Sequence, residues 1–418
     1  MDKIKIRGGN SLSGVVEVSG SKNAALPILF SSVLTDELCV YKRVPDLQDI
    51  HSTLVLLKYL NIDCEFKSEQ HEAQLKANCV NKHEAPYDLV RKMRASVVVL
   101  GPLLAKYGKA KVSLPGGCAI GARPINYHLS GLEKLGAKIQ LENGYVIASC
   151  KRLRGTRVCL EFPSVGATEN IMMAATLAKG ETVIENTARE PEISDLACAL
   201  RAMGAQIEGD GTERIFVQGQ TSLHGCQYQI MGDRIEAGTY LAAALATKGC
   251  IEVTGINTKH LEAVLKKLEK TGAQIERKEN AVLLRSPKKL KSVNIVTSPF
   301  PGFPTDMQAQ FMVIMAIANG ISHIKETIFE NRFMHVPELI RLGANIIIDG
   351  NMAIIHGVKN LIGAPLMATD LRASASLIIG ALCAEGESIV NRIYHLDRGY
   401  EKMEIKLRAL GADIERIL

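Results

Sequence analysis

One segment of the sequence holds a thiol in a setting suited to chemistry. Residues 114–124 read Leu-Pro-Gly-Gly-Cys-Ala-Ile-Gly-Ala-Arg-Pro, with Cys118 near the middle. Glycine and proline at this density exclude a helix or a strand, so we predict a loop. A thiol with an ordinary pKa of about 8.5 stays largely protonated at neutral pH and can donate a proton, while a nearby cation such as Arg123 would make it more nucleophilic. We interpret Cys118 as a proton donor or nucleophile; the simpler alternative is a glycine-rich turn with an incidental cysteine.

Cations recur at the starts of the predicted helices. Backbone N–H groups at a helix N-terminus attract phosphate and carboxylate, and two arginines after predicted strands, Arg332 and Arg398, have the planar fork that binds such anions. A buried group of cations without an anion would be costly, so the pattern predicts an anionic ligand in a cleft that these helix ends share. The residues at the helix starts are Lys22, Arg91, Arg94, Arg234 and Arg372, with Ser164-Val165-Gly166, Thr305-Asp306 and Thr369-Asp370 at equivalent positions.

The two Thr-Asp pairs also have a simpler interpretation. A threonine or aspartate directly before a helix usually accepts hydrogen bonds from the first unpaired backbone N–H groups. For Asp306 and Asp370, each taken singly, we favour this capping role.

Several cofactor classes lack support in the sequence. No Walker loop, G-x-G-x-x-G fingerprint or cluster with metal-ligand spacing occurs, so we expect neither a metal nor an organic cofactor. The ten cysteines include no C-x-x-C pair, and residues such as Cys198 and Cys383 lie in apolar segments. We interpret them as small core residues in the reducing cytoplasm.

The segments that must position these residues repeat along the chain. A helix ends in a Gly-Ala turn five times, with glycines at 136, 204, 272, 343 and 411 that are spaced by 68, 68, 71 and 68 residues. A sixth, degenerate copy is Leu60-Asn61-Ile62. Each copy has the order βαβαββ, with a helix of small residues first and an amphipathic helix second, and we expect glycine to close the second helix in the left-handed conformation.

The second copy breaks the pattern. From the glycine after the first helix to the Gly-Ala turn, later copies use 23 to 25 residues, whereas the second uses 28, from Gly108 to Gly136. The excess falls in the Cys118 loop, and an insertion into a regular architecture usually carries function.

The six copies divide naturally into two groups of three. Residues 1–21 resemble the strands that would complete the sixth copy, so we expect Ile4 to Val18 to pair with strands of that copy. The predicted domains are therefore 22–229, with the Cys118 loop, and 1–21 plus 230–418, with Asp306, Asp370 and Arg398. The fold class is α/β.

Bulk composition excludes some functions. The chain has 418 residues, 47% of them hydrophobic, and a net charge of +6, which is mild and not concentrated in a basic run. We therefore expect neither nucleic-acid nor membrane binding. The apolar run from Ala24 to Leu34 is too short to span a bilayer and falls where the first helix belongs.

Four motifs together resemble the enolpyruvyl transferase family, and within it the UDP-N-acetylglucosamine 1-carboxyvinyltransferases. The resemblance runs from about residue 3 to the end. The motifs are the Cys118 loop, Ser21-Lys22-Asn23-Ala24-Ala25, Phe303-Pro304-Thr305-Asp306-Met307-Gln308 and Ala368-Thr369-Asp370-Leu371-Arg372-Ala373-Ser374. It implies a two-domain inside-out α/β barrel built from six repeats, in agreement with the count above.

The resemblance also implies an activity in peptidoglycan precursor synthesis. The 3′-hydroxyl of UDP-N-acetylglucosamine would attack phosphoenolpyruvate, a tetrahedral phospholactoyl intermediate would form, and phosphate would leave. Cys118 would be the general acid toward the methylene carbon and the target of the epoxide fosfomycin. Asp306 would orient or deprotonate the hydroxyl, and Asp370 would also belong to the catalytic set.

The remaining implied roles concern substrate binding. Lys22, Arg123 and Arg398 would hold the phosphate, and Arg332 and Arg372 would lie near the carboxylate or the cleft. Some relatives carry lysine where this chain has Phe162, so a basic partner for the diphosphate is missing here. The implied sugar-nucleotide set is Asn23, Arg94, Arg123, Pro124, Ile125, Asn126, Tyr127, Ser164, Val165, Gly166, Asp306 and Ile328.

Three alternatives stay open at the level of sequence. A sister enzyme that uses shikimate 3-phosphate would have the same fold, but we would not expect it to have the cysteine loop. A catalytically silent relative could bind UDP-sugars as a regulator, although Lys22, Cys118, Asp306 and Arg398 are all present. A redox sensor at Cys118 would usually have a resolving cysteine close by, and none is near in sequence.

Overall fold

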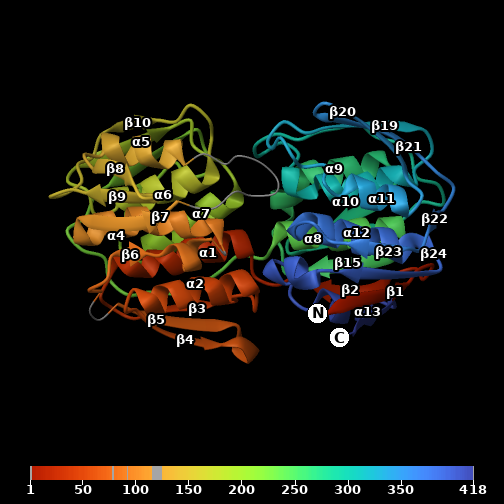
Figure 1. The fold of residues 1–418 in the computed structure, drawn as a ribbon, viewed down its shortest axis with the longest axis horizontal. Helices are drawn as coiled ribbons and strands as arrows, with labels where there is room; N and C mark the ends of the chain where they lie inside the picture. Colours follow the sequence, from red (N-terminus) through yellow and green to blue (C-terminus); the bar gives the residue numbers. More distant parts are fainter. Residues whose placement is uncertain (1, 78–79, 92, 115–124, 418) are drawn as a thin grey trace. The chain divides into compact units, whose positions relative to one another are not determined.

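Two compact units make up the described chain. The computed structural model describes residues 2–77, 80–91, 93–114 and 125–417. Within these, the N-terminal unit comprises residues 20–231, and the C-terminal unit comprises 2–19 and 232–417 (Figure 1). Each unit encloses its own cluster of buried apolar side chains.

In the part of the chain that the structure describes, six four-stranded sheets, three in each unit, confirm the sixfold repeat. Within a sheet the outer strand of one edge runs parallel to its neighbour, and the other two strands pair with each other in antiparallel fashion. The sheets of the N-terminal unit, in order of pairing, are β14 (Gln227–Gln229), β3 (Cys39–Lys42), β5 (Glu72–Lys76) and β4 (Asp63–Lys67); β6 (Glu84–Ala85), β7 (Lys109–Ser113), β9 (Tyr145–Ser149) and β8 (Lys138–Glu142); and β10 (Arg157–Cys159), β11 (Glu181–Glu185), β13 (Arg214–Gln218) and β12 (Gln206–Glu208).

The C-terminal unit repeats this arrangement. Its sheets are β16 (Gln274–Arg277), β17 (Ala281–Arg285), β15 (Cys250–Thr254) and β2 (Ser13–Glu17); β18 (Ile295–Val296), β19 (Ile321–Lys325), β21 (Met352–His356) and β20 (Asn345–Asp349); and β23 (Pro365–Met367), β25 (Glu387–Asn391), β1 (Lys3–Arg7) and β26 (Asp413–Ile417). A small two-stranded sheet, β22 (Leu361–Ile362) with β24 (Ala384–Glu385), completes it.

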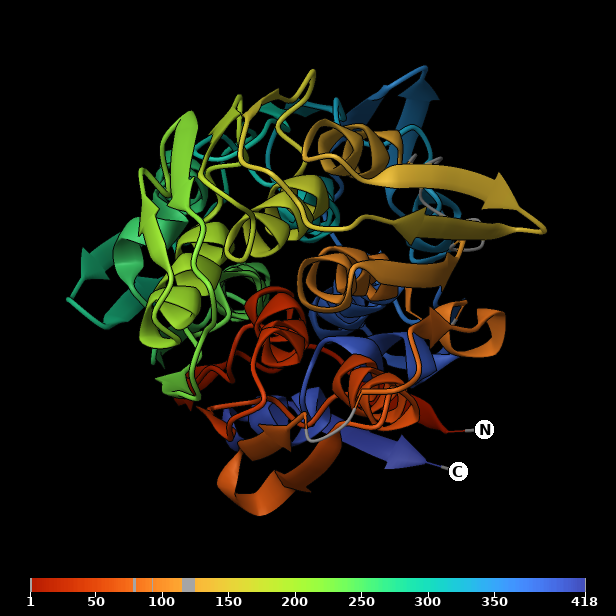
Figure 2. The same ribbon diagram turned by 90° about the vertical axis from the view of Figure 1, so that its left-hand side faces the viewer.

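The first helix of each repeat lies inside its unit. Every residue of α8 (Arg234–Ala246) and α10 (Gln308–Ala316) is buried, as expected of a helix without a polar face. Strands instead alternate between buried and exposed residues, as β13 does, so one face of each sheet contacts solvent. Helices at the centre and sheets outside make each unit an inside-out α/β barrel (Figures 1 and 2). The other inner helices are α1 (Lys22–Ser31), α4 (Leu100–Tyr107), α6 (Val165–Ala175) and α12 (Leu371–Cys383).

The second helix of each repeat ends as the sequence predicted. Gly136 and Gly411 have φ angles of 97° and 100°, a region that favours glycine, and the Gly-Ala turns at 204, 272 and 343 share it. Asn61 serves the same purpose in the degenerate copy, with φ at 66°. These outer helices are α2 (Gln48–Tyr59), α5 (Asn126–Lys134), α7 (Pro191–Ala202), α9 (Glu262–Lys270), α11 (Val336–Arg341) and α13 (Met403–Ala409).

The N-terminal segment contributes one strand to each of two repeats. Strand β1 lies between β25 and β26 and completes the sheet of the sixth repeat, as expected. Strand β2 pairs in parallel with β15, which belongs to the fourth repeat. The expectation that residues 4–18 pair with the sixth repeat is therefore wrong for β2, because the pairing of a parallel strand is set by the closure of the barrel and not by the local pattern.

Two further observations concern the surface. Cys198 is exposed, and so is Cys159, so the core assignment was wrong for Cys198, whereas Cys383 is partly buried. Among the described residues, no helix is both long and apolar enough to cross a bilayer.

Candidate active site

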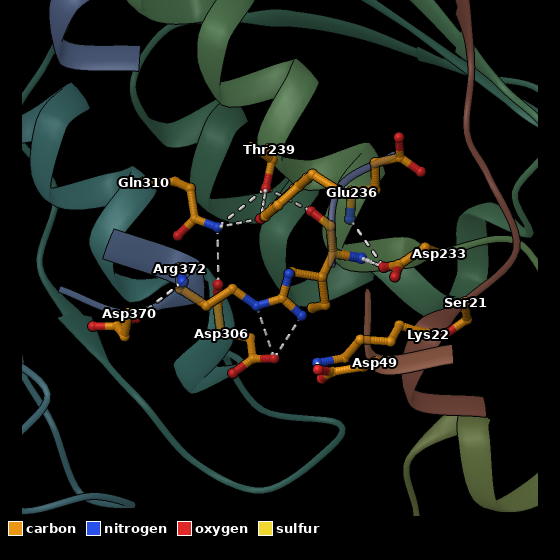
Figure 3. A network of polar contacts seen from close by, with 12 residues as sticks. Ser21, Lys22, Asp49, Asp233, Glu236, Thr239, Asp306, Gln310, Asp370 and Arg372 are labelled. Atoms are coloured by element: carbon orange, nitrogen blue, oxygen red, sulfur yellow. Dashed lines mark hydrogen bonds and ion pairs between the residues drawn. The ribbon is translucent and has the colours of Figure 1, made fainter. Parts of the chain in front are cut away.

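An aspartate in the C-terminal unit is held between two buried arginines. Asp306 lies in a short 3₁₀ turn, Thr305–Met307, directly before α10. Arg332 Nη2 donates to its Oδ1 at 2.8 Å. Arg372 donates to Oδ2 through Nη2 at 2.8 Å and Nε at 3.1 Å (Figure 3). Both arginine side chains are 4% exposed, whereas that of Asp306 is 26% exposed. The capping interpretation of Asp306 was wrong, because α10 begins after Met307 and both carboxylate oxygens of Asp306 accept from arginines.

The two arginines decide the protonation state of Asp306. Burial alone would raise the pKa of this carboxyl, but the charges of Arg372 and Arg332 and their hydrogen bonds outweigh burial and hold the pKa well below its ordinary value. The group is therefore a carboxylate at any physiological pH. It can accept a hydrogen bond and orient an alcohol, but it is a weak base while both guanidinium groups bind it.

Asp370 takes the role that Asp306 does not. Its Oδ1 accepts hydrogen bonds from the backbone N–H groups of Arg372 and Ala373, each at 3.0 Å, so it caps α12 and confirms the capping interpretation.

The charge of Asp370 also acts on two histidines. Burial lowers the pKa of His335 to about 4, with Arg332 adding to the effect and Asp370 opposing it. Burial and Arg398 likewise lower the pKa of His395, again against Asp370.

Sequence reasoning missed a carboxylate that organises this region. Glu326 follows β19 and is 2% exposed. Its Oε1 accepts from the hydroxyl of Thr297 and the N–H of Ile328, both at 2.8 Å, and from the N–H of Phe329 at 3.3 Å. Its Oε2 accepts from the hydroxyl of Thr305 at 2.8 Å. Glu326 thus fixes both the turn that carries Asp306 and the loop that leads to Arg332, yet no sequence motif marks it.

In the N-terminal unit, a lysine begins an inner helix. Lys22 is the first residue of α1 and follows the N-cap Ser21. It is 8% exposed, and its Nζ lies 3.2 Å from Oδ2 of Asp49 on α2 (Figure 3). Asp49 is the second functional candidate that the sequence did not reveal. A buried ammonium group with an acidic partner stays charged and can bind an anion. Asn23, the next residue, is partly buried.

The start of α6 also fits an anion. Ser164 caps this helix, with its hydroxyl accepting from the N–H of Ala167, and the N–H groups of Val165 and Gly166 belong to the first turn. An ideal Cβ on Gly166 would lie 3.1 Å from the ring of His128, so the backbone passes close to this imidazole. Phe162, two residues before the cap, is 39% exposed.

A buried amide fixes the tautomer of His128. Oδ1 of Asn170 accepts the N–H of Gly101 at 2.6 Å, so its Nδ2 must be the group that contacts the carbonyl of Val97 and Nδ1 of His128, at 3.1 and 3.0 Å. Nδ1 is therefore an acceptor, and the ring proton is on Nε2, which together with Cε1 borders Gly166.

The other predicted residues have plainer surroundings. Asn126 begins α5 and is exposed, while Ile125, Tyr127 and Ile328 are partly buried in their loops and turns. Arg398 ends a 3₁₀ turn, Ile393–Arg398, and is partly buried. Cys118, Arg123 and Pro124 lie outside the described residues, as does the side chain of Arg94. No three His, Cys, Asp or Glu side chains of the described chain come together so as to hold a metal ion.

The whole chain is similar to proteins of one family. The family model for EPSP synthase (3-phosphoshikimate 1-carboxyvinyltransferase) matches residues 6–407. The chain belongs to this family of carboxyvinyl transferases. Within it, two curated relatives, both named UDP-N-acetylglucosamine 1-carboxyvinyltransferase, are 56% identical to the chain: one from Nitratidesulfovibrio vulgaris, over 417 residues, and one from Idiomarina loihiensis, over 418. The alignments cover 100% of this chain and 99% and 100% of the two relatives.

Solved structures of the family have the same fold. The enolpyruvyl transferase NikO from Streptomyces tendae superposes with a TM-score of 0.90 at 25% identity, covering 100% of this chain and 99% of NikO. EPSP synthase from Acinetobacter baumannii superposes with a TM-score of 0.78 at 17% identity over 100% of both chains, which shows the shared fold alone.

Proposed function

We propose that this chain transfers the enolpyruvyl group of phosphoenolpyruvate to the 3′-hydroxyl of UDP-N-acetylglucosamine and releases phosphate, the first committed step of peptidoglycan precursor synthesis. The observation that carries the proposal is the identity of 56% over the full length to relatives with that named activity. The eight cysteines that the structure describes are free, which fits the cytoplasm as the compartment of this reaction.

The proposed chemistry is addition followed by elimination. The hydroxyl oxygen bonds to C2 of phosphoenolpyruvate and its proton passes to Asp306, while Cys118 delivers a proton to C3. The product is a tetrahedral phospholactoyl ether. The Cys118 thiolate then takes a proton back from C3 as the bond between C2 and the phosphate oxygen breaks, which restores the double bond, and the departing phosphate carries away the proton held by Asp306. Asp306, as a carboxylate with a low pKa, orients the hydroxyl as a hydrogen-bond acceptor. It becomes a stronger base when an anionic substrate draws Arg332 or Arg372 away.

We assign the remaining residues to groups of the two substrates by their charge. The two substrates together carry about five negative charges, and cationic residues recur in both units. Lys22, Arg123 and Arg398 bind phosphate, and Arg332 and Arg372 bind the carboxylate. Asp370 supports the catalytic set as the cap that holds the start of α12 in place. The sugar nucleotide contacts Asn23, Arg94, residues 123–127, Ser164, Val165, Gly166, Asp306 and Ile328.

A second candidate acceptor is shikimate 3-phosphate. The family model carries the name of the enzyme that uses this acceptor, and the EPSP synthase structure shares the fold. Identity of only 17% to that structure, against 56% to the UDP-N-acetylglucosamine enzymes, favours the sugar nucleotide.

Release of inorganic phosphate tests the proposal. The purified chain is mixed with phosphoenolpyruvate and either UDP-N-acetylglucosamine or shikimate 3-phosphate, and phosphate is measured over time. We expect phosphate release when UDP-N-acetylglucosamine is the acceptor and none when shikimate 3-phosphate is. The Asp306→Asn variant should release no phosphate with either acceptor. Release only with shikimate 3-phosphate would establish the alternative, and release with neither acceptor from a folded protein would refute both.

A further inference from the structure

The interior of the C-terminal unit contains a polar cluster that the proposed reaction leaves without a role. Thr239 on α8, Gln310 on α10 and Tyr400 are each at most 1% exposed and contact one another. Polar groups at such depth are costly unless they are hydrogen-bonded, and this position among the inner helices would otherwise be apolar. The cluster lies directly beside Arg372 and the backbone of Asp306 (Figure 3).

The direction of the hydrogen bonds follows from counting hydrogens. The single hydrogen of the Thr239 hydroxyl goes to the carbonyl of Ile235, which is 2.7 Å away. Its oxygen must therefore accept from the Tyr400 hydroxyl at 2.9 Å and from Nε2 of Gln310 at 3.1 Å. The second hydrogen of Gln310 Nε2 goes to the backbone carbonyl of Asp306 at 2.9 Å. Each hydrogen of the cluster thus has one short acceptor.

Tyr400 also lies beside Arg372. Its hydroxyl donates to Thr239, and its oxygen receives a long contact from Nε2 of Gln310 at 3.4 Å. The guanidinium carbon of Arg372 lies 5.4 Å from the centre of the Tyr400 ring, within the range of a cation–π contact. Nε and Nη2 of Arg372 bind Asp306, whereas Nη1 is buried with no hydrogen-bond partner among the described residues. The guanidinium of Arg372 thus has both Asp306 and the Tyr400 ring as neighbours.

The cluster thus contacts Asp306 through its backbone carbonyl and, by way of Arg372, through its carboxylate. Gln310 holds its backbone carbonyl, and the single 3₁₀ turn around it has no side-chain cap. Its carboxylate is held by Arg372, whose guanidinium carbon lies 5.4 Å from the centre of the Tyr400 ring. A small displacement of either contact would misalign the carboxylate, and an error of about 1 Å in a catalytic group can cost about 100-fold in rate.

We propose that Tyr400, fixed by its hydrogen bond to Thr239 and accompanied by Gln310, is a positioning residue that aligns Arg372 and Asp306 for the transfer reaction. This inference rests on the proposed function for its kinetic consequence, but the alignment itself exists in the ligand-free protein.

The kinetic test uses two nearly isosteric variants and a matched control. Tyr400→Phe keeps the ring and removes the oxygen, while Thr239→Val removes the acceptor that holds it. We expect kcat to fall about 10-fold in each, with the KM for UDP-N-acetylglucosamine within about twofold of wild type, and no further fall in the double variant, because both changes break one chain of hydrogen bonds. The control is Tyr240→Phe on the same helix as Thr239; the Tyr240 hydroxyl is buried without a partner among the described residues. It should leave kcat unchanged.

A second readout needs no substrate. Hydrogen exchange of the Arg372 Nε–H, followed by ¹⁵N NMR in the ligand-free protein, should be faster in Tyr400→Phe and Thr239→Val than in wild type or Tyr240→Phe. If wild type shows no transferase activity but exchange is still faster in Tyr400→Phe and Thr239→Val, the alignment is upheld and only the proposed function is refuted. Unchanged exchange together with a kcat within twofold of wild type would overturn the positioning role. Equal losses in Tyr400→Phe and Tyr240→Phe would also overturn it, because they would reflect core packing only.

Discussion

Replacement of Asp306 by asparagine should destabilise the C-terminal unit. The variant keeps the shape of the side chain but removes the negative charge between Arg332 and Arg372, whose side chains are both 4% exposed. Removing one partner of a buried ion pair costs about 3–5 kcal/mol, and partial exposure of Asp306 places the expected loss near the lower end, at about 3 kcal/mol. For a unit of this size that corresponds to a fall in Tm of about 6–12 °C.

Differential scanning calorimetry at neutral pH measures this effect, and Asp210→Asn is the matched control. Arg201 Nη1 lies 2.7 Å from Asp210 Oδ1, but these side chains are 35% and 15% exposed, so the loss there should be about 1 kcal/mol or less. The reasoning fails if both variants melt within about 2 °C of wild type, or if Asp210→Asn lowers the Tm as much as Asp306→Asn does.

Three further predictions address other parts of the chain. Cys118→Ala should bind UDP-N-acetylglucosamine but lose phosphate release, and Cys118→Asp should keep turnover yet escape alkylation by fosfomycin; near-normal turnover of the alanine variant would remove Cys118 from the mechanism. Burial raises the pKa of Asp195 to about 6 against the hydrogen bonds it accepts. The folded state therefore binds an additional proton between about pH 4 and 6, and wild type should gain stability relative to Asp195→Asn as the pH falls from 8 to 5; a constant difference in Tm would contradict this. An ideal Cβ on Gly131 would lie 2.2 Å from Cδ1 of Ile171, so Gly131→Ala should cost about 1–3 kcal/mol in urea unfolding, and Ile171→Val should recover part of that loss; no recovery would exclude the clash as the cause.

The repeat could be predicted from the sequence because its signals are local. A turn that requires the left-handed conformation selects glycine or asparagine wherever it occurs, so the period of the turns reports the period of the fold. Asn61 at φ 66° follows the same rule in the degenerate copy. The partner of β2 could not be predicted, since a parallel strand pairs with whichever neighbour the closed barrel places beside it.

Asp306 and Asp370 show the same limit within the candidate site. Both follow a threonine directly before an inner helix, and both fit the local pattern of a cap. Asp370 is a cap, whereas Asp306 binds two arginines that lie 26 and 66 residues away along the chain. Only the folded structure brings those charges together. Glu326 and Asp49 were missed for the same reason, because their partners are distant and no motif surrounds them.

The position of β1 between β25 and β26 has a consequence for biosynthesis. The N-terminal unit is encoded by one continuous stretch, so it can close as soon as residue 231 has left the ribosome. Strand β1 is made well before its two partner strands, which end at residues 391 and 417. At about 5–20 residues per second, β1 waits roughly 20–80 s with its edges unpaired. A pause in translation between β15 and β25 would lengthen this exposure, and a nascent chain stalled there should bind chaperones through its first residues while its N-terminal unit is already protected from proteases.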